Sequence, residues 1–301
     1  KLDRVGVSVS AFSAEQMQAL GLSRATDVAQ FSPGVVMEST AGAGLNATLT
    51  VRGVAATDYS ANQESPNAIY IDDVYYNRIA LATLDFVDVQ QIETLRGPQG
   101  TLYGKNTTAG AINITTNQPT FDFEGRAELT AGNLKYKQGK AAVSGPLSDT
   151  VAARIAVATT SRRGTIYNTR TQRWINEQDN LGLRGALLFK PSEDLSITLS
   201  GDYSKQDAYG FGTSYVRVGK TQRVLTRQYD ALVAAYNVAN PTKPYAVPST
   251  NVYDRLTDID APLEAGNKIG GASLRVKWNV GPGAFTSISA WRFWDWKPQN
   301  D

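Results

Sequence analysis

The sequence predicts a small α+β domain at the N-terminus, followed by a sheet of antiparallel β-strands. Up to about residue 118, short apolar runs alternate with two helix patterns and glycine-rich polar segments, as is typical of an α+β domain with many loops. After Asn117-Gln118-Pro119, apolar and polar residues alternate with a period of two through most of the chain. This alternation is the pattern of strands that have one apolar and one wet face.

Local signals mark each element of the N-terminal part. Ser13 can cap a short helix, because Gln16 stands where it completes a capping box and Gly21 stands where the helix should end. A second helix is expected over 24–30, since a proline and a glycine follow it closely. Four apolar runs predict short strands, at 47–54, 67–76, 89–97 and 110–116.

Seven strands are predicted in the C-terminal part. In one of them, Leu183 and Leu187 fall on one face and Arg184 and Lys190 on the other. Such strands fit either a soluble antiparallel sheet or a membrane barrel with lipid outside and a polar lumen. The predicted strands lie at about 122–132, 136–145, 151–163, 180–190, 195–208, 268–279 and 284–297.

The connections between these strands favour the barrel. The tight turns GPLSD, PSED and VGPG alternate with long segments at 164–179 and 209–267, and outer-membrane barrels have short periplasmic turns and long extracellular loops. Phe189 and Trp278 precede two of the turns, where an interfacial aromatic girdle would lie, although ordinary core positions are the alternative. The stretch RQYDALVAAYNVA in the second long loop has helical spacing and predicts a short helix over the mouth.

Composition excludes several function classes. The chain has no Cys and no His, so it cannot form disulfides, a His-based zinc site or a Ser-His-Asp triad. Its 30 Lys and Arg against 28 Asp and Glu are too balanced for a nucleic-acid binder. It contains no run of apolar residues long enough for a membrane-spanning helix. We therefore expect no enzyme activity, no cofactor, no metal centre and no nucleic-acid partner.

The stretch RGPQGTLYGKNTTAGAINITT, residues 96–116, has glycines, a lysine and hydroxyl residues in an order close to that of a phosphate-binding loop. That motif needs four residues between its last two glycines and a Ser or Thr directly after its lysine. Here Gly100 and Gly104 have three residues between them, and Lys105 is followed by Asn106. We predict that the stretch binds no nucleotide and that its glycines serve tight turns and close packing.

The same stretch carries a family resemblance. Together with VSVSAFSAEQM, LTVRGV and YIDDVYY, the sequence IETLRGPQGTLYGKNTTAGAINITT resembles the plug domain of TonB-dependent outer-membrane receptors. The resemblance implies a plug domain over 1–118, folded inside an antiparallel transmembrane β-barrel of about 22 strands. Residues 119–301 would then supply about seven of those strands in the outer membrane of a Gram-negative bacterium.

The resemblance also implies a function and its partners. Receptors of this family take up a scarce ligand actively, with energy delivered through TonB, ExbB and ExbD. A ferric siderophore is the default ligand, and a glycan, cobalamin or an aromatic compound is the alternative. Other classes stay open: a passive outer-membrane channel or adhesin, and a secreted carbohydrate-binding protein.

The resemblance also implies site residues, at the positions of this sequence that match the family's plug motifs. Arg52 and Arg96 match the two plug arginines that pair with barrel glutamates in this family and hold the plug in place. A solvated arginine in the lumen is the alternative for each. The apices of the plug, which face the ligand, correspond to five positions, Asp58, Tyr59, Tyr75, Tyr76 and Asn77. Packing against the barrel wall is the alternative for the tyrosines.

Seven strands cannot close a barrel, because an open edge in lipid leaves backbone groups without hydrogen bonds. Strand 284–297 is long, apolar and free of proline within the strand, so a bare edge would aggregate. We expect the rest of the barrel, as a continuation or a second chain, to pair with 284–297 and with 122–132. We also expect the TonB-binding box to lie upstream of Lys1.

Overall fold

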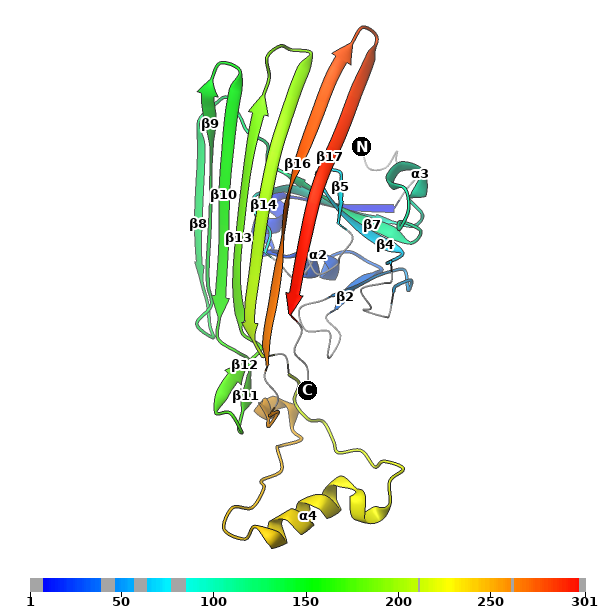
Figure 1. Cartoon of the computed structure of the whole chain (residues 1–301), viewed down its shortest axis with the longest axis vertical. Helices are drawn as coiled ribbons and strands as arrows, with labels where there is room; N and C mark the ends of the chain where they lie inside the picture. The colour runs from blue at the N-terminus through cyan, green and yellow to red at the C-terminus, as the bar shows by residue number, and fades with distance from the viewer. Residues whose placement is uncertain are drawn as a thin grey trace.

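The computed structural model describes residues 8–38, 47–56, 64–76, 85–210, 212–260 and 263–297. Seven long strands lie side by side in one sheet, and the N-terminal domain packs against one side of it (Figure 1). We call this seven-stranded sheet the wall. The plug-in-barrel arrangement expected from the sequence is therefore present as a domain held against a partial antiparallel wall.

The N-terminal domain contains a five-stranded sheet in the order β1-β6-β7-β4-β5 and a separate pair, β2-β3. The predicted capping box begins the first helix: the Ser13 hydroxyl accepts from the Gln16 backbone N–H at 3.3 Å, and the Gln16 side chain accepts from the Ser13 N–H at 3.0 Å. The elements are β1 (Ser8–Ser13), α1 (Ala14–Ala19), α2 (Ala25–Gln30), β2 (Val35–Glu38), β3 (Thr48–Val51), β4 (Asn67–Ile71), β5 (Val74–Tyr76), β6 (Val89–Arg96), α3 (Gly100–Tyr103) and β7 (Gly110–Thr116).

The glycine-rich stretch builds the centre of this sheet. Strand β7 lies between β6 and β4, pairing antiparallel with the first and parallel with the second. A Cβ at Gly110 would lie 2.6 Å from the Leu95 carbonyl oxygen, so only glycine allows the two strands to approach this closely. Ile112 and Ile92 are 1% and 0% exposed in the core that results. The glycines thus serve packing, as the sequence predicts.

The wall strands match the predicted ranges within a few residues, and each is antiparallel to the next along the chain. Outward positions carry exposed apolar side chains, with Leu129 90%, Ile155 64% and Trp291 65% exposed. Inward positions alternate with these and face the N-terminal domain. The strands are β8 (Glu124–Ala131), β9 (Lys137–Ser148), β10 (Val151–Arg162), β13 (Gln178–Phe189), β14 (Leu195–Tyr209), β16 (Glu264–Val280) and β17 (Gly283–Lys297).

The two ends of the wall differ, as the loop lengths predict. Tight turns join β9 to β10, β13 to β14 and β16 to β17 at one end, and the long segments leave from the other (Figure 1). The second long segment holds the predicted helix as α4 (Tyr229–Ala239). It also holds two short 3-10 helices, η3 (Leu225–Arg227) and η4 (Val252–Asp254). Among the described residues, no helix is long and apolar enough to cross a membrane.

The long segments contain a small sheet that the sequence analysis missed. Strands β11 (Ile166–Asn168) and β12 (Arg173–Ile175) form a hairpin, and β15 (Leu256–Thr257) pairs with β11 in parallel. The long strand β16 also begins at Glu264, four residues before the predicted 268. Both long loops are therefore shorter than expected, and they are joined to each other at their base.

Two tryptophans near the end of β17 point inward. Trp294 and Trp296 lie on the same, inward face as Arg292 and are half-buried. Their rings stack at 5.4 Å between centroids, and the Trp294 Nε1 donates to Asn267 Oδ1 at 2.6 Å. Both faces of β17 carry large apolar groups, so only its register in the sheet decides which residues point outward.

Candidate functional site: the contact between the N-terminal domain and the wall

The turn between β4 and β5 presents two carboxylates to the wall. Asp72 and Asp73 both have positive φ, 50° and 64°, which suits a two-residue hairpin turn and which Asp tolerates better than most residues. Arg184 on β13 lies 2.6 Å from an Asp72 carboxylate oxygen, and Arg275 on β16 lies 2.6 Å from an Asp73 carboxylate oxygen. Arg275 also donates to the Asp72 backbone carbonyl. The strained turn thus docks between two wall strands.

Asp72 is also bound within its own domain. Its carboxylate accepts from the Thr116 backbone N–H at 2.9 Å and from the Thr116 hydroxyl at 2.7 Å. Only 13% of the Asp72 side chain and 9% of the Arg184 side chain are exposed. Buried charges need such pairing, because an unpaired ion away from water is costly.

A second ion pair lies nearer the short-turn end of the wall. Asp88, another aspartate with positive φ at 59°, accepts from Arg154 Nη2 of β10 at 2.7 Å and from the Asn117 side chain at 2.9 Å. The Asp88 and Arg154 side chains are 6% and 10% exposed. The carboxylate of Glu124 lies 3.6 Å from the same guanidinium. This pair fixes the end of the N-terminal domain at the point where the chain enters the wall.

A third group combines side chains from three wall strands, β13, β14 and β17, with the domain. Arg184, Asp202 and Arg292 are in register across the sheet, and Gly271 of β16 lies between the last two. Arg292 forms two hydrogen bonds of 2.6 Å with the Asp202 carboxylate by reaching across Gly271. A Cβ at Gly271 would lie 3.0 Å from the Arg292 Cδ and 2.1 Å from the Trp291 carbonyl oxygen. Because residue 271 is a glycine, no side chain blocks the path of the Arg292 side chain to Asp202.

Tyr76 is the residue that the N-terminal domain contributes to this third group. Its hydroxyl lies 3.4 Å from Asp202 Oδ1, and the Arg292 guanidinium lies 4.2 Å from the centre of its ring. A cation over an aromatic face is attracted by the ring's electron density. Burial, followed by the Asp202 charge, raises the pKa of the Tyr76 hydroxyl well above its ordinary value. The hydroxyl is therefore neutral and available as a donor to the carboxylate.

A cavity of about 690 Å³ lies between α1 and the first three wall strands. Its lining includes Met17 from the domain and Arg126, Glu128 and Lys140 from the wall. Charged groups of both signs make this a space for water rather than for an apolar ligand. The ion pairs, not continuous apolar packing, hold this part of the domain to the wall.

Arg52 and Arg96, predicted as the lock, come together at one place. The Arg52 N–H donates to the Gly34 carbonyl at 2.7 Å, and Arg96 Nη1 donates to the neighbouring Pro33 carbonyl at 2.8 Å. Within the described part of the chain, neither guanidinium forms an ion pair with a carboxylate, and the Arg96 Nε is buried without a hydrogen-bond partner. The lock role stays a prediction.

The predicted ligand residues are only partly described. Asp58, Tyr59 and Asn77 lie outside the described residues. Tyr75 is half-buried, and its hydroxyl accepts from the Asn106 side chain at 2.9 Å. Tyr76 is 7% exposed and faces the wall as described above. Their role toward a ligand stays a prediction.

Apart from Tyr76, for which packing against the barrel wall was the stated alternative, the residues that join domain and wall were missed by the sequence analysis, although signals for them exist. Each of the strands β10, β13, β16 and β17 carries an arginine on its inward face. An aspartate pair stands between the apolar runs of β4 and β5. Charge on the inward face and carboxylates in a tight turn indicate an interface, but they do not say which pairs form.

An antiparallel wall with an apolar outer face, a charged inner face and a domain held inside defines a plugged outer-membrane barrel protein. Residues 1–111 match the family model described as the TonB-dependent receptor plug domain. The N-terminal domain is therefore a TonB-dependent receptor plug domain, and the strands of an antiparallel wall follow it. Receptors of this family are transport proteins of the Gram-negative outer membrane rather than enzymes, and this chain shares that location.

The relatives that are similar in sequence are also receptors. The chain is 33% identical over 144 residues to the pesticin receptor of Yersinia enterocolitica, covering 48% of this chain and 21% of the relative. It is 24% identical over 204 residues to the ferrioxamine receptor of the same organism, covering 68% of this chain and 27% of the relative. The chain thus spans about a quarter or less of the length of these relatives.

Solved structures show the same fold. The ferric yersiniabactin uptake receptor FyuA of Yersinia pestis superimposes with a TM-score of 0.75 at 22% identity, covering 98% of this chain and 42% of that one. The open form of the ferric-catecholate import receptor Fiu of Escherichia coli K12 superimposes with a TM-score of 0.66 at 18% identity, covering 96% of this chain and 38% of that one. From here on we call the N-terminal domain the plug.

Proposed function

We propose that this chain forms the plug and the first part of the barrel of a receptor that takes up a ferric siderophore across the outer membrane. The observation that carries the proposal is the plug itself, held against the inward face of the wall by two buried ion pairs, from Asp72 and Asp88, and by a more exposed pair from Asp73. A passive pore has no use for a domain fixed inside its lumen. The siderophore follows from the relatives, whose names include the ferrioxamine and catecholate siderophore receptors.

The mechanism requires that the plug be held firmly and still be movable. Ion pairs are suited to this, because their strength falls when water enters the interface, whereas a continuous apolar contact would resist displacement. Energy would come through TonB with ExbB and ExbD. We propose a plug over 1–118 and a wall over 119–301, with the remaining strands of the same receptor pairing with the free edges of β8 and β17.

Arg52 and Arg96 would hold the plug in place by forming ion pairs with carboxylates on those remaining strands. Their adjacency and the unpartnered Arg96 Nε support this role, because a buried donor without a partner costs free energy unless another group satisfies it. Asp58, Tyr59, Tyr75 and Asn77 are proposed to contact the ligand at the plug apices. Tyr76 would reach a ligand only after the plug moves, since its side chain is buried at the wall.

Uptake in cells that carry the complete receptor tests the proposal. Accumulation of iron from radiolabelled ferric siderophores should depend on the receptor and should stop when a protonophore removes the proton gradient. Uptake that survives the protonophore would indicate a passive channel. Uptake of an oligosaccharide or cobalamin, with no uptake of any iron chelate, would support active uptake by a receptor but contradict the proposal that its ligand is a ferric siderophore.

A further inference from the structure

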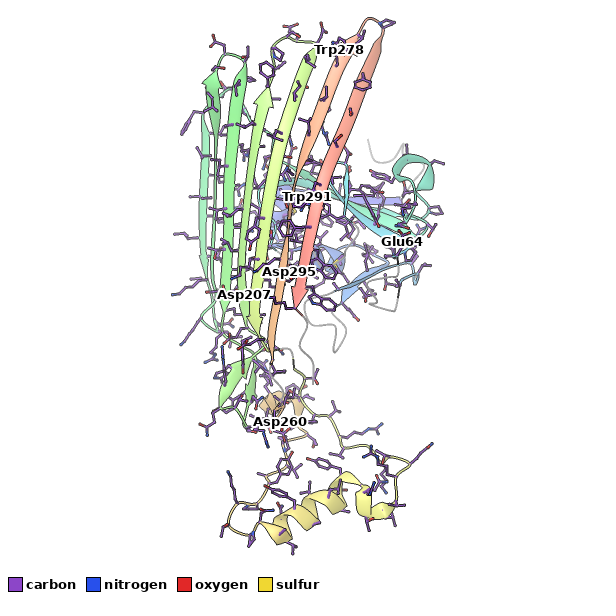
Figure 2. All side chains as sticks on the ribbon, in the orientation of Figure 1. Glu64, Asp207, Asp260, Trp278, Trp291 and Asp295 are labelled. Atoms are coloured by element: carbon purple, nitrogen blue, oxygen red, sulfur yellow. The ribbon has the colours of Figure 1, made fainter. Side chains whose placement is uncertain are left out.

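Positively charged side chains on the inward face of the wall form a series that leads toward the short-turn end. Residues paired across the strands define rows, and successive inward rows lie about 7 Å apart along a strand. Figure 2 shows Trp278, the residue directly after the last member of the series, near the short-turn end. The series, which we call the cation ladder, has Arg184 and Arg292 in one row, Arg154 in the next, Arg275 in the one after it and Lys277 in the last.

The wall itself does not balance the charge of the cation ladder. On the described strands from β10 to β17, Asp202 is the one carboxylate at the inward positions of these rows. Arg292 already binds it through two hydrogen bonds of 2.6 Å. Ala156, Ala186 and Ser200 are among the other inward residues of the first two rows, and their small side chains leave room beside the long arginines.

The plug supplies most of the missing negative charge. Asp72, Asp73 and Asp88 pair with the ladder residues Arg184, Arg275 and Arg154, as described above. Lys277 is different, because it is exposed and has no carboxylate partner among the described residues. If the ladder served only to dock the plug, it would end where the plug carboxylates end. Its last member therefore needs another explanation.

We propose that the cation ladder is the surface along which an anionic iron chelate crosses the lumen once the plug moves. The plug aspartates occupy the places of the chelate's oxygen anions until then. The inference rests on the proposed uptake of a ferric siderophore, and it narrows the ligand to a chelate with net negative charge. It also gives a role to Lys277, which takes no part in docking.

Electrostatics supports this role. When the plug aspartates leave, Asp202 alone remains in these rows to offset the five cations of the ladder. A lumen lined by one sign of charge raises the local concentration and the entry rate of opposite ions on the order of 10–1,000-fold. Guanidinium groups bind oxygen anions through paired hydrogen bonds. Because the rows are about 7 Å apart, an anionic chelate can contact the next cation before it leaves the last.

Lys277 allows a test that leaves the ion pairs of the plug intact. Iron uptake is measured in cells that carry the complete receptor, with a radiolabelled ferric tris-catecholate as the anionic probe and a ferric trihydroxamate as the uncharged probe. Lys277→Gln should lower the maximal rate of tris-catecholate uptake severalfold, and Lys277→Glu should lower it on the order of 10-fold. Lys277→Arg should keep the rate. Binding of the probe to the cell surface should not change, since Lys277 stands at the opposite end of the wall from the long loops.

Lys268→Glu is the matched control. Lys268 lies on the same strand as Lys277, but it is in register with Lys205 on the outward face. This variant should take up the tris-catecholate at the unmodified rate, and heat-modifiable migration on a gel verifies that each variant is folded.

Three results would overturn the ladder and leave siderophore uptake standing. They are an unchanged rate of tris-catecholate uptake in Lys277→Glu, an equal loss in Lys268→Glu, and uptake of the uncharged probe alone. If no iron chelate were taken up in a manner sensitive to a protonophore, both the ladder and the proposed function would fail. The two failures are therefore distinguishable.

Discussion

Replacing Arg184 by methionine should release the plug turn that carries Asp72. Methionine keeps much of the arginine's apolar length but leaves the buried carboxylate without its 2.6 Å partner. Removing one member of a buried ion pair costs on the order of 3–5 kcal/mol. Asp72 keeps its two hydrogen bonds from Thr116, so the lower end, ~3 kcal/mol, is expected.

Hydrogen exchange measures this loss directly. The Thr116 N–H donates to the Asp72 carboxylate, and the Asp72 N–H donates to the Ile114 carbonyl at 2.9 Å. Both amides exchange when the turn opens. Since each ~1.4 kcal/mol is a factor of ten, a loss of ~3 kcal/mol should speed their exchange by on the order of 100-fold. The measurement uses the complete receptor in detergent micelles.

Arg170→Met is the control, because Arg170 and Asp260 form an ion pair whose side chains are 57% and 63% exposed. Exposed pairs contribute ~1 kcal/mol or less. The double variant Asp72→Asn, Arg184→Met should exchange more slowly than Arg184→Met alone, because no unpaired charge stays buried. If Arg184→Met changed the two amides no more than Arg170→Met does, the ion pair would not hold the plug and the reasoning would be refuted.

Three further predictions concern other contacts. Gly271→Ala should destabilise the wall by about 1–3 kcal/mol through overpacking, seen as a lower urea midpoint in near-UV circular dichroism; an unchanged midpoint would contradict the close approach. Replacing Arg52 and Arg96 by alanine in the complete receptor should increase leakage of small solutes into liposomes, and unchanged leakage would contradict the lock. Burial and the Asp258 carboxylate raise the pKa of Tyr215 to about 12 from an ordinary value of about 10. The stabilisation from this neutral phenol is therefore present below pH of about 10 and is lost as pH rises through about 12. Ultraviolet titration should show this late phenolate, and Asp258→Asn should shift it toward the ordinary value.

The sequence alone determined what depends on neighbouring residues. The capping box of Ser13 and Gln16 began α1 as predicted, because both partners lie within one helical turn. The alternation of Leu183 and Leu187 with Arg184 predicted β13 and its two faces, because side chains of a strand alternate by geometry. Turn and loop lengths predicted which ends of the wall are short and which are long.

Only the tertiary structure decided which distant groups meet. Asp72 and Arg184 are 112 residues apart, and Asp73 and Arg275 are 202 apart, so no local pattern links them. Several wall arginines and plug aspartates are equivalent by sequence, and the docking of a strained turn between β13 and β16 selects the pairs. The direction of the Trp294 and Trp296 side chains on β17 and the hydrogen bonds of Tyr215 and Tyr245 to Asp258 likewise depend on strand register and on contacts between loops, which form only when the whole chain is packed.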